Sequence, residues 1–511
     1  MRSVEIVLLL VVLATAVAAS AHRLRVPAPS LLVLAGLAIA MIPGVPAVQI
    51  SPNVVSVVVL PPLLYAAGQD LPWPELKPVW RPVTVLALGL VLASAAAVAG
   101  VAVALTPLST PMAFVLGTVL ASTDPVAVTA LGRRLPLPPR LHALIQAESL
   151  FNDATSLVLF RVATAFAVVG GTVPWGRAGL DFLLAAGGGA GIGAVVAAGV
   201  SLIRRRTEDP VLETVTALVT PYAAYVLAES AHVSGITAVV VASVILAGQA
   251  TRLTNAQIRL QLHAVYDTVI FLLESVVFSL IGLQLPTLVR AVDGHSWGWV
   301  LQAAAVTGTL LAVRALWVFP LSIVIQRRHG GSASWRVPAV VSWAGARGVL
   351  PLAAALSIPL ATRAGTPLEN RDLVLLLTTA VIATTLVVQG TTLGPLVRWS
   401  GVALPPGHAR DEQARARAAM TGAALAHLDE VARLEAAPAA TVEQLRELTR
   451  TRLARPGDGA PLGPGLRRLR RDLIAIEAAE LTRLYGDGEI GAATRRELQR
   501  RLDLEDASLD D

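Results

Sequence analysis

Residues 148–153 read Glu-Ser-Leu-Phe-Asn-Asp and stand inside a run that otherwise reads as a membrane-spanning helix. Residues three or four apart share one face of a helix, so Glu148 aligns with Asn152 and Ser149 aligns with Asp153. One stripe of this helix is therefore polar, whereas the rest is Leu, Phe, Val and Ala. Because charged groups are costly at membrane depth, the stripe predicts a functional site.

The composition around this stretch is that of a polytopic membrane protein. Of the 511 residues, 54% are hydrophobic and 15% are charged, and apolar runs recur along the first 400 residues. The chain has no cysteine, which excludes disulfides, thiolate metal sites and cysteine nucleophiles. Its net charge of +6 comes from basic residues in short loops, so we predict no nucleic-acid partner. We also predict no cofactor.

Apolar windows of about 20 residues, the length that crosses a hydrocarbon core, predict thirteen spans. They lie near residues 4–21, 27–45, 53–70, 82–106, 112–132, 141–169, 179–203, 211–231, 234–250, 265–287, 297–326, 337–360 and 371–398. The first could instead be a cleaved signal peptide, because residues 18–21 resemble a cleavage site. An odd number of spans places the two termini on opposite sides.

The distribution of basic residues predicts the orientation, since cytoplasmic loops are enriched in Lys and Arg. Loops after odd-numbered spans hold fifteen basic residues, among them Arg204 to Arg206. Loops after even-numbered spans hold four: Arg177, Arg290, Arg363 and Arg371. We therefore predict a plasma (inner) membrane protein with its N-terminus outside and its C-terminus in the cytoplasm.

The composition changes abruptly after residue 400, which divides the chain into a transmembrane domain, 1–400, and a cytoplasmic extension, 401–511. The extension contains 17 Arg and 19 Asp or Glu. Its predicted helices, separated by Pro- and Gly-rich breaks, are 411–436, 441–454, 466–485 and 492–504. They are expected to pack on one another, on a partner subunit or on the membrane domain; the sequence does not identify a binding partner of this tail.

A second carboxylate, Asp124, lies in another apolar run, in Ser122-Thr123-Asp124-Pro125. Proline removes a backbone donor and disfavours helix at the preceding residue, so this span is expected to unwind around Thr123 and Asp124. Transporters use such broken helices to coordinate ions near the membrane midplane. The alternative is a kink with a locally capped aspartate.

Arg347 is the third polar element, in residues 343–348, which read Trp-Ala-Gly-Ala-Arg-Gly and again suggest an interrupted span. A buried arginine needs a partner, and Glu148 is the carboxylate that we predict for it. Arg347 could instead reach the cytoplasmic rim or Glu274. Arg161 and Arg314 are expected to form structural pairs or to reach the interface.

These residues predict a cation and proton pathway. Burial favours the protonated form of a carboxylate, so Asp153 could exchange a proton for a cation. An ion channel on the same polar spans is a second interpretation. A membrane hydrolase with an Asp124–Asp153 dyad is a third, although no hydrolase motif is present. We therefore predict a transporter and not an enzyme.

Five stretches along the chain resemble the monovalent cation:proton antiporters of the sodium/proton exchanger type. They are Ser122–Val126 (STDPV), Glu148–Ala154 (ESLFNDA), Leu218–Glu229, Ile281–Pro286 (IGLQLP) and Trp343–Gly348 (WAGARG). The resemblance implies an all-α fold of inverted repeats with two crossed, partly unwound helices, and a homodimer in the lipid membrane. It implies exchange of Na⁺, or of Li⁺ or K⁺, for H⁺ in pH and sodium homeostasis.

The resemblance also assigns roles to residues. It implies that Asp153 carries the ion and the proton, that Na⁺ binds at Asp153 and Asp124, and that Glu148 pairs with Arg347. Three further residues, Thr123, Ser149 and Asn152, would help to form the site. Asn152, where related branches carry a second aspartate, is associated with electroneutral exchange.

The third predicted span departs from the family pattern. Some relatives carry a glutamate there, whereas this chain has Ala66. A cation ligand from that helix is therefore in doubt: either water or a backbone oxygen replaces it, or the ion selectivity differs.

Overall fold

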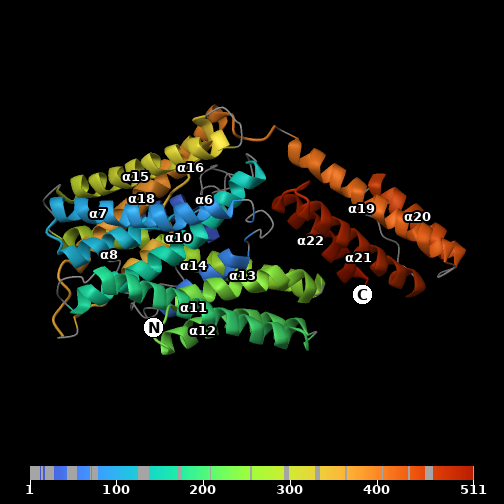
Figure 1. Cartoon of the computed structure of the whole chain (residues 1–511), viewed down its shortest axis with the longest axis horizontal. Helices are drawn as coiled ribbons and strands as arrows, with labels where there is room; N and C mark the ends of the chain where they lie inside the picture. The colour runs from blue at the N-terminus through green and yellow to red at the C-terminus, as the bar shows by residue number, and fades with distance from the viewer. Residues whose placement is uncertain are drawn as a thin grey trace.

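In the computed structural model of the chain, α-helices form a long body, and four further helices lie beside one end of it (Figure 1). The structure describes residues 12, 15–17, 28–42, 55–69, 71, 77, 79–124, 137–169, 175–207, 209–253, 256–292, 298–328, 334–362, 365–405, 407–434, 438–454 and 464–509. Over these ranges the predicted all-α class is confirmed.

Seven described helical stretches are long and apolar enough to cross a membrane. They are α6 to α7 (Trp80–Thr84, η2 Val85–Leu90 and Val91–Leu105), α10 (Pro139–Val169), α11 (Trp175–Arg204), α12 (Pro210–Ser230), α14 (Ala256–Ala291), α15 (Gly298–Arg328) and α18 (Arg371–Ser400). Shorter apolar helices are α2 (Ala28–Ala40), α4 (Leu60–Gln69, directly after the π-helical stretch η1, Val55–Val59), α8 (Thr110–Ala121) and α13 (Gly235–Leu253). The chain is thus a multi-pass membrane protein, as predicted.

Three predicted spans differ from the observed helices, one of them the span 112–132, whose helix α8 ends at Ala121. The span predicted at 337–360 is two short helices, α16 (Arg336–Trp343) and α17 (Val349–Leu356), as its glycines suggested. Helix α14 begins at Ala256, well before the predicted 265, because its polar first turns pack against the tail. The first predicted span, 4–21, lies outside the described residues except for residues 12 and 15–17.

The helices of the body pack in two groups. One group contains α7, α8, α10, α15, α16, α17 and α18, and the other contains α2, α4, α11, α12, α13 and α14. Small residues bring α2 and α14 into backbone contact, since a Cβ at Gly282 would lie only 2.0 Å from the Val33 carbonyl oxygen. The groups meet where α10 packs on α11 and α13, and where α14 packs on α17 and α18.

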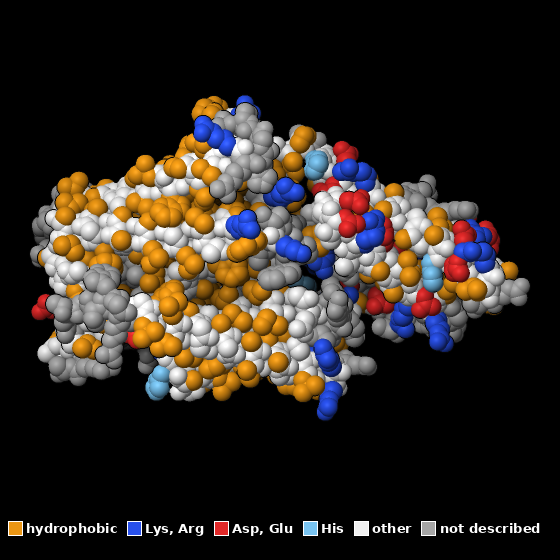
Figure 2. All heavy atoms as spheres, viewed as in Figure 1, with side chains coloured by type: hydrophobic (Ala, Val, Ile, Leu, Met, Phe, Trp, Pro, Cys, Tyr) orange, Lys and Arg blue, Asp and Glu red, His pale blue; other side chains and the backbone are white. Residues whose placement is uncertain are grey.

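The tail consists of α19 (His408–Arg433), α20 (Ala439–Ala454), α21 (Pro464–Gly486) and α22 (Ala492–Ser508), close to the four helices predicted there. Its buried Leu, Ile, Val and Ala side chains form two small cores between these helices. Lys, Arg, Asp and Glu gather mostly over the tail and its junction with the body, whereas the visible face of the body is largely hydrophobic (Figure 2).

The tail also packs on the membrane domain. Helix α22 lies against α14, where Arg259 Nε and Nη2 donate to the two carboxylate oxygens of Asp503. The turn before α22 reaches the first turn of α10, since a Cβ at Gly491 would lie 3.1 Å from the Cγ of Pro139. The tail helices therefore pack on one another and on the membrane domain, which are two of the three packing partners that the sequence allowed.

Candidate functional site

Two helix interruptions meet inside the first helix group. Helix α8 ends at Ala121, and Ser122, Thr123 and Asp124 are not helical. The second interruption is the stretch 344–348 between α16 and α17. The amide of Asp124 donates to the carbonyl oxygen of Ala346 at 2.7 Å, so the two unwound segments touch. The unwinding predicted around Thr123 and Asp124 and the interruption predicted around Arg347 are confirmed, although residues 125–136 lie outside the described residues.

The polar stripe of α10 satisfies the backbone that α8 leaves unpaired. Ser149 Oγ donates to the Thr123 carbonyl oxygen at 2.6 Å, and the Thr123 amide donates to Asn152 Oδ1 at 3.2 Å. Asn152 Nδ2 also donates to Thr123 Oγ1 at 2.5 Å. All three residues are buried. Because buried backbone groups need partners, Ser149 and Asn152 replace the hydrogen bonds that a continuous helix would supply.

Both predicted carboxylates lie at this junction. Asp153 is 5% exposed, and its Oδ1 accepts a hydrogen bond from Ser122 Oγ. The Asp124 carboxylate lies against Gly348, where an added Cβ would come within 1.5 Å of Oδ2. Asp124, which is half-buried, also acts electrostatically on Asp153, so two acidic groups lie near each other at this junction. Such a pair attracts a cation or a proton.

Further oxygen atoms lie at the same junction as these two acids. The hydroxyls of Ser122 and Thr123, the amide of Asn152 and the two carboxylates are the ligand types that alkali and alkaline-earth cations take in proteins. Ser122 was not among the predicted site residues. Its position at the end of a helix, directly before the unwound Thr123-Asp124, was the signal that could have indicated it.

The partner of Glu148 is Arg314 of α15. Arg314 Nη1 and Nη2 donate to the two carboxylate oxygens of Glu148 at 2.6 and 3.0 Å. The same guanidinium donates from Nε and Nη2 to the Val341 carbonyl oxygen at 3.2 and 3.1 Å. The side chains of Arg314 and Glu148 are 2% and 1% exposed, so this is a fully buried, bidentate ion pair.

The predicted Glu148–Arg347 pair is therefore wrong. Arg347 lies in the interruption between α16 and α17, where it donates to carbonyl oxygens that broken helices leave unpaired. Its Nε donates to Leu120 O at 3.0 Å, and its Nη1 donates to Gly345 O. The carboxylate of Glu148 was already neutralised by Arg314, so Arg347 links the end of α8 to the interruption instead.

Arg161, the other arginine inside a span, lies farther along α10. Its Nη1 donates to Glu229 Oε1 at 2.9 Å, and both side chains are 36% exposed. The pair connects α10 to the end of α12, in agreement with the structural pairing expected for Arg161. It lies away from the carboxylates of the junction.

Known proteins are similar to this chain along most of its length. The family "Sodium/hydrogen exchanger, transmembrane" matches residues 7–399. An uncharacterised Na⁺/H⁺ exchanger of Mycobacterium tuberculosis is 35% identical over 96% of this chain and 93% of its own length. The low-affinity Na⁺/H⁺ antiporter NhaS1 of Synechocystis is 32% identical over 72% of this chain and 68% of its own length.

A solved structure shows the same fold. The sodium proton antiporter MjNhaP1 of Methanocaldococcus jannaschii superimposes with a TM-score of 0.62, covering 78% of this chain and 98% of that protein at 21% identity. With the family match over nearly the whole membrane domain, these similarities establish that the chain belongs to the sodium/hydrogen exchanger family.

Proposed function

We propose that the protein exchanges Na⁺ for H⁺ across the plasma membrane, with Asp153 as the group that carries either ion. The observation that carries this proposal is the buried junction at which Asp153 and Asp124 meet two unwound helix segments. A carboxylate there holds a proton or a cation but not both, so binding of one ion requires release of the other. Competition of this kind couples the two fluxes.

The neighbouring residues have distinct roles in this proposal. Na⁺ binds at Asp153 and Asp124, with Ser122 and Thr123 supplying further oxygen atoms. Ser149 and Asn152 hold Thr123 in its unwound conformation through the three hydrogen bonds described above. Arg314 neutralises Glu148, which leaves the negative charge of the pocket on the two aspartates.

The wider organisation follows the same proposal. Thirteen spans in inverted repeats, within residues 1–400, would place the N-terminus outside and the tail, residues 401–511, in the cytoplasm. The protein would act as a homodimer in the lipid bilayer and serve pH and sodium homeostasis. One positive charge would cross in each direction, which the resemblance to the family associates with an asparagine at position 152.

Transport is expected to depend on the cation. In vesicles with an acidic interior that contain the purified protein, added Na⁺ or Li⁺ should collapse the pH gradient, because each displaces the proton from the site. Adding Na⁺, Li⁺ and K⁺ in turn also tests K⁺/H⁺ exchange. This exchange is the second candidate, because the chain has Ala66 where some relatives carry a glutamate. Collapse without any added cation would instead indicate a proton conductance, and current without counter-transport would indicate a channel.

Electroneutrality has a separate test. If one Na⁺ exchanges for one H⁺, clamping the membrane potential with a potassium ionophore should leave the Na⁺-dependent rate unchanged, because no net charge moves. A rate that rises or falls with the imposed potential would contradict one-for-one exchange while leaving the exchange activity itself intact.

Gly348→Ala is expected to reduce the exchange rate by at least about tenfold, since displacement of a binding group by about 1 Å is costly in a preorganised site. The new Cβ would overlap the Asp124 carboxylate, which must move away from the junction. Gly100→Ala on α7 is the matched control, because a Cβ there meets no atom within 4 Å. Equal rates in both variants would show that the position of Asp124 does not matter for transport.

A further inference from the structure

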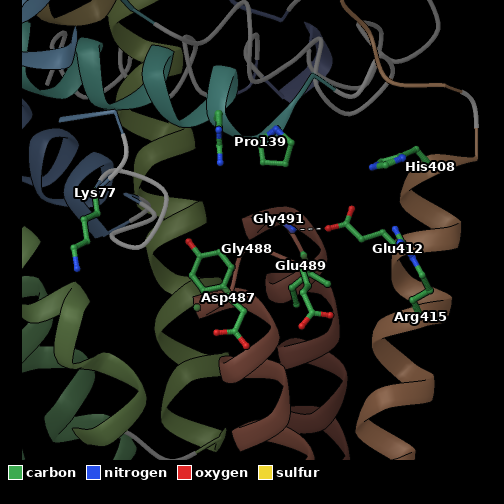
Figure 3. Close-up of a pocket in the computed structure, with 13 residues that line it drawn as sticks. Lys77, Pro139, His408, Glu412, Arg415, Asp487, Gly488, Glu489 and Gly491 are labelled. Atoms are coloured by element: carbon green, nitrogen blue, oxygen red, sulfur yellow. Dashed lines mark hydrogen bonds between the residues drawn. The ribbon is translucent and has the colours of Figure 1, made fainter. Parts of the chain in front are cut away.

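A charged pocket of about 600 Å³ lies between the tail and the membrane domain. Figure 3 shows Lys77 on one side, His408 and Arg415 of α19 on the other, and Pro139 of α10 above the turn that joins α21 to α22. We propose that this pocket binds a small soluble molecule with phosphate groups, of about the size of a nucleotide. The proposal goes beyond ion exchange, and its test measures binding rather than transport.

The acidic side chains of the pocket have partners within the tail. Glu412 Oε1 accepts a hydrogen bond from the Gly491 amide, drawn as a dashed line in Figure 3. Asp487 and Glu489 lie 2.6 and 3.5 Å from Arg483 Nη1. Each of these carboxylates therefore already has a hydrogen-bond or ion-pair partner.

The basic side chains differ in this respect. Lys77, Arg140 and Arg415 line the pocket from three separate segments, and none forms an ion pair with a carboxylate of the described residues. His408 adds a further nitrogen. The lining holds as many acidic as basic side chains, but only the basic ones lack such partners among the described residues, so they are the groups open to an anion. Arginine pairs with phosphate oxygens through two parallel hydrogen bonds. The unpaired basic side chains thus favour a phosphate-bearing ligand.

The walls fit an organic molecule better than a bare ion. The volume lies within the range of about 300–1,000 Å³ that is typical of small-molecule sites. Tyr485, Ile490 and Pro139 contribute apolar surface. The turn reads Gly-Asp-Gly-Glu-Ile-Gly over residues 486–491, and a Cβ at Gly486 or Gly488 would meet no atom within 4 Å, which leaves this wall open to a ligand.

The pocket lies where its occupant would affect the ion site. Gly491 contacts Pro139 in the first turn of α10, and α10 carries Asp153 on the same continuous helix. The other end of α22 is attached to α14 through Asp503 and Arg259. A ligand that binds both the tail and Arg140 would strengthen the docked position of the tail against α10.

Calorimetric titration of the full-length protein in detergent with ATP, ADP and pyrophosphate tests the proposal. We expect saturable binding, and we expect Arg140→Gln and Arg415→Gln each to raise Kd about tenfold, the effect of losing one charge-assisted contact. Arg410→Gln is the matched control, since Arg410 also lies on α19 but does not line the pocket, and it should leave Kd unchanged.

Three results would overturn the proposal. They are the absence of saturable binding for all three probes, equal Kd values in the pocket and control variants, and competition from lipid. For the last, titrations are repeated in nanodiscs of phosphatidylglycerol and of phosphatidylcholine. Loss of nucleotide binding only with phosphatidylglycerol would assign the pocket to a lipid headgroup instead, whereas equal binding in both lipids supports a soluble ligand.

Discussion

Asp153→Ala is expected to reduce cation-dependent collapse of the pH gradient to the level of vesicles without protein. In the proposed mechanism the Asp153 carboxylate is the group for which the cation and the proton compete. Asp153 is only 5% exposed at the junction of the two unwound segments, so bulk water does not take over the role of its carboxylate. The measurement is the fluorescence of a pH dye in acid-interior vesicles after Na⁺ or Li⁺ is added.

Two further variants separate loss of function from loss of fold. Asp153→Asn keeps an oxygen that can accept the hydrogen bond from Ser122 but removes the charge, and it should be as inactive as Asp153→Ala. Asp181→Asn removes an exposed carboxylate from α11 and should transport at the normal rate. Sodium-dependent collapse in Asp153→Asn would refute the assignment of the carrier to this carboxylate.

The positions of most membrane helices follow directly from local sequence. Runs of apolar residues cannot leave lipid without cost and their backbone must pair internally, so windows of about 20 residues locate α10, α11, α12, α15 and α18 well. The same logic fails where tertiary packing extends a helix, as at the start of α14, which packs on the tail.

The polar face of the ion site was predictable for a similar reason. Helical spacing alone puts Ser149 and Asn152 near each other, and the pair Asp124-Pro125 marks a break in the helix. These two features meet at Thr123 through tertiary packing. The contact satisfies the need to pair the backbone groups of an unwound segment. The sequence therefore indicated the residues but not the hydrogen bonds.

The partner of Glu148 could not be predicted from the sequence. Arg314 and Arg347 both lie in predicted spans, and each is more than 160 residues from Glu148 along the chain, as the separation of 166 for Arg314 shows. Which arginine faces the acid depends on how α15 and the α16–α17 interruption pack on α10. Local patterns carry no information about that choice.

The tail shows the same limit. Amphipathic spacing predicted its four helices closely, because each buries one apolar stripe against the others. Its docking on α14 and α10 depends on single contacts, such as Arg259 with Asp503, which resemble ordinary surface charges in the sequence. The pocket formed by this docking has no local signature for the same reason.

The second large effect is expected at the buried ion pair between Arg314 and Glu148. Arg314→Gln is expected to lower the free energy of unfolding by about 3–5 kcal/mol, because Glu148 then keeps a buried charge without its bidentate partner. Unfolding of the protein in detergent, followed by circular dichroism during a denaturant titration, measures this loss. Arg161→Gln removes a half-exposed arginine from a similar pair and should cost less than about 1 kcal/mol.

A second substitution distinguishes the two arginines as partners of Glu148. Adding Glu148→Gln to Arg314→Gln removes the unpaired charge, so the double variant should recover most of the lost free energy, which is the coupling expected of residues in direct contact. Adding Glu148→Gln to Arg347→Gln should give no recovery, because Arg347 donates to the Leu120 and Gly345 carbonyl oxygens instead. The opposite pattern, with recovery only in the Arg347 background, would restore the pairing that the sequence predicted and would place Arg314 outside the ion site.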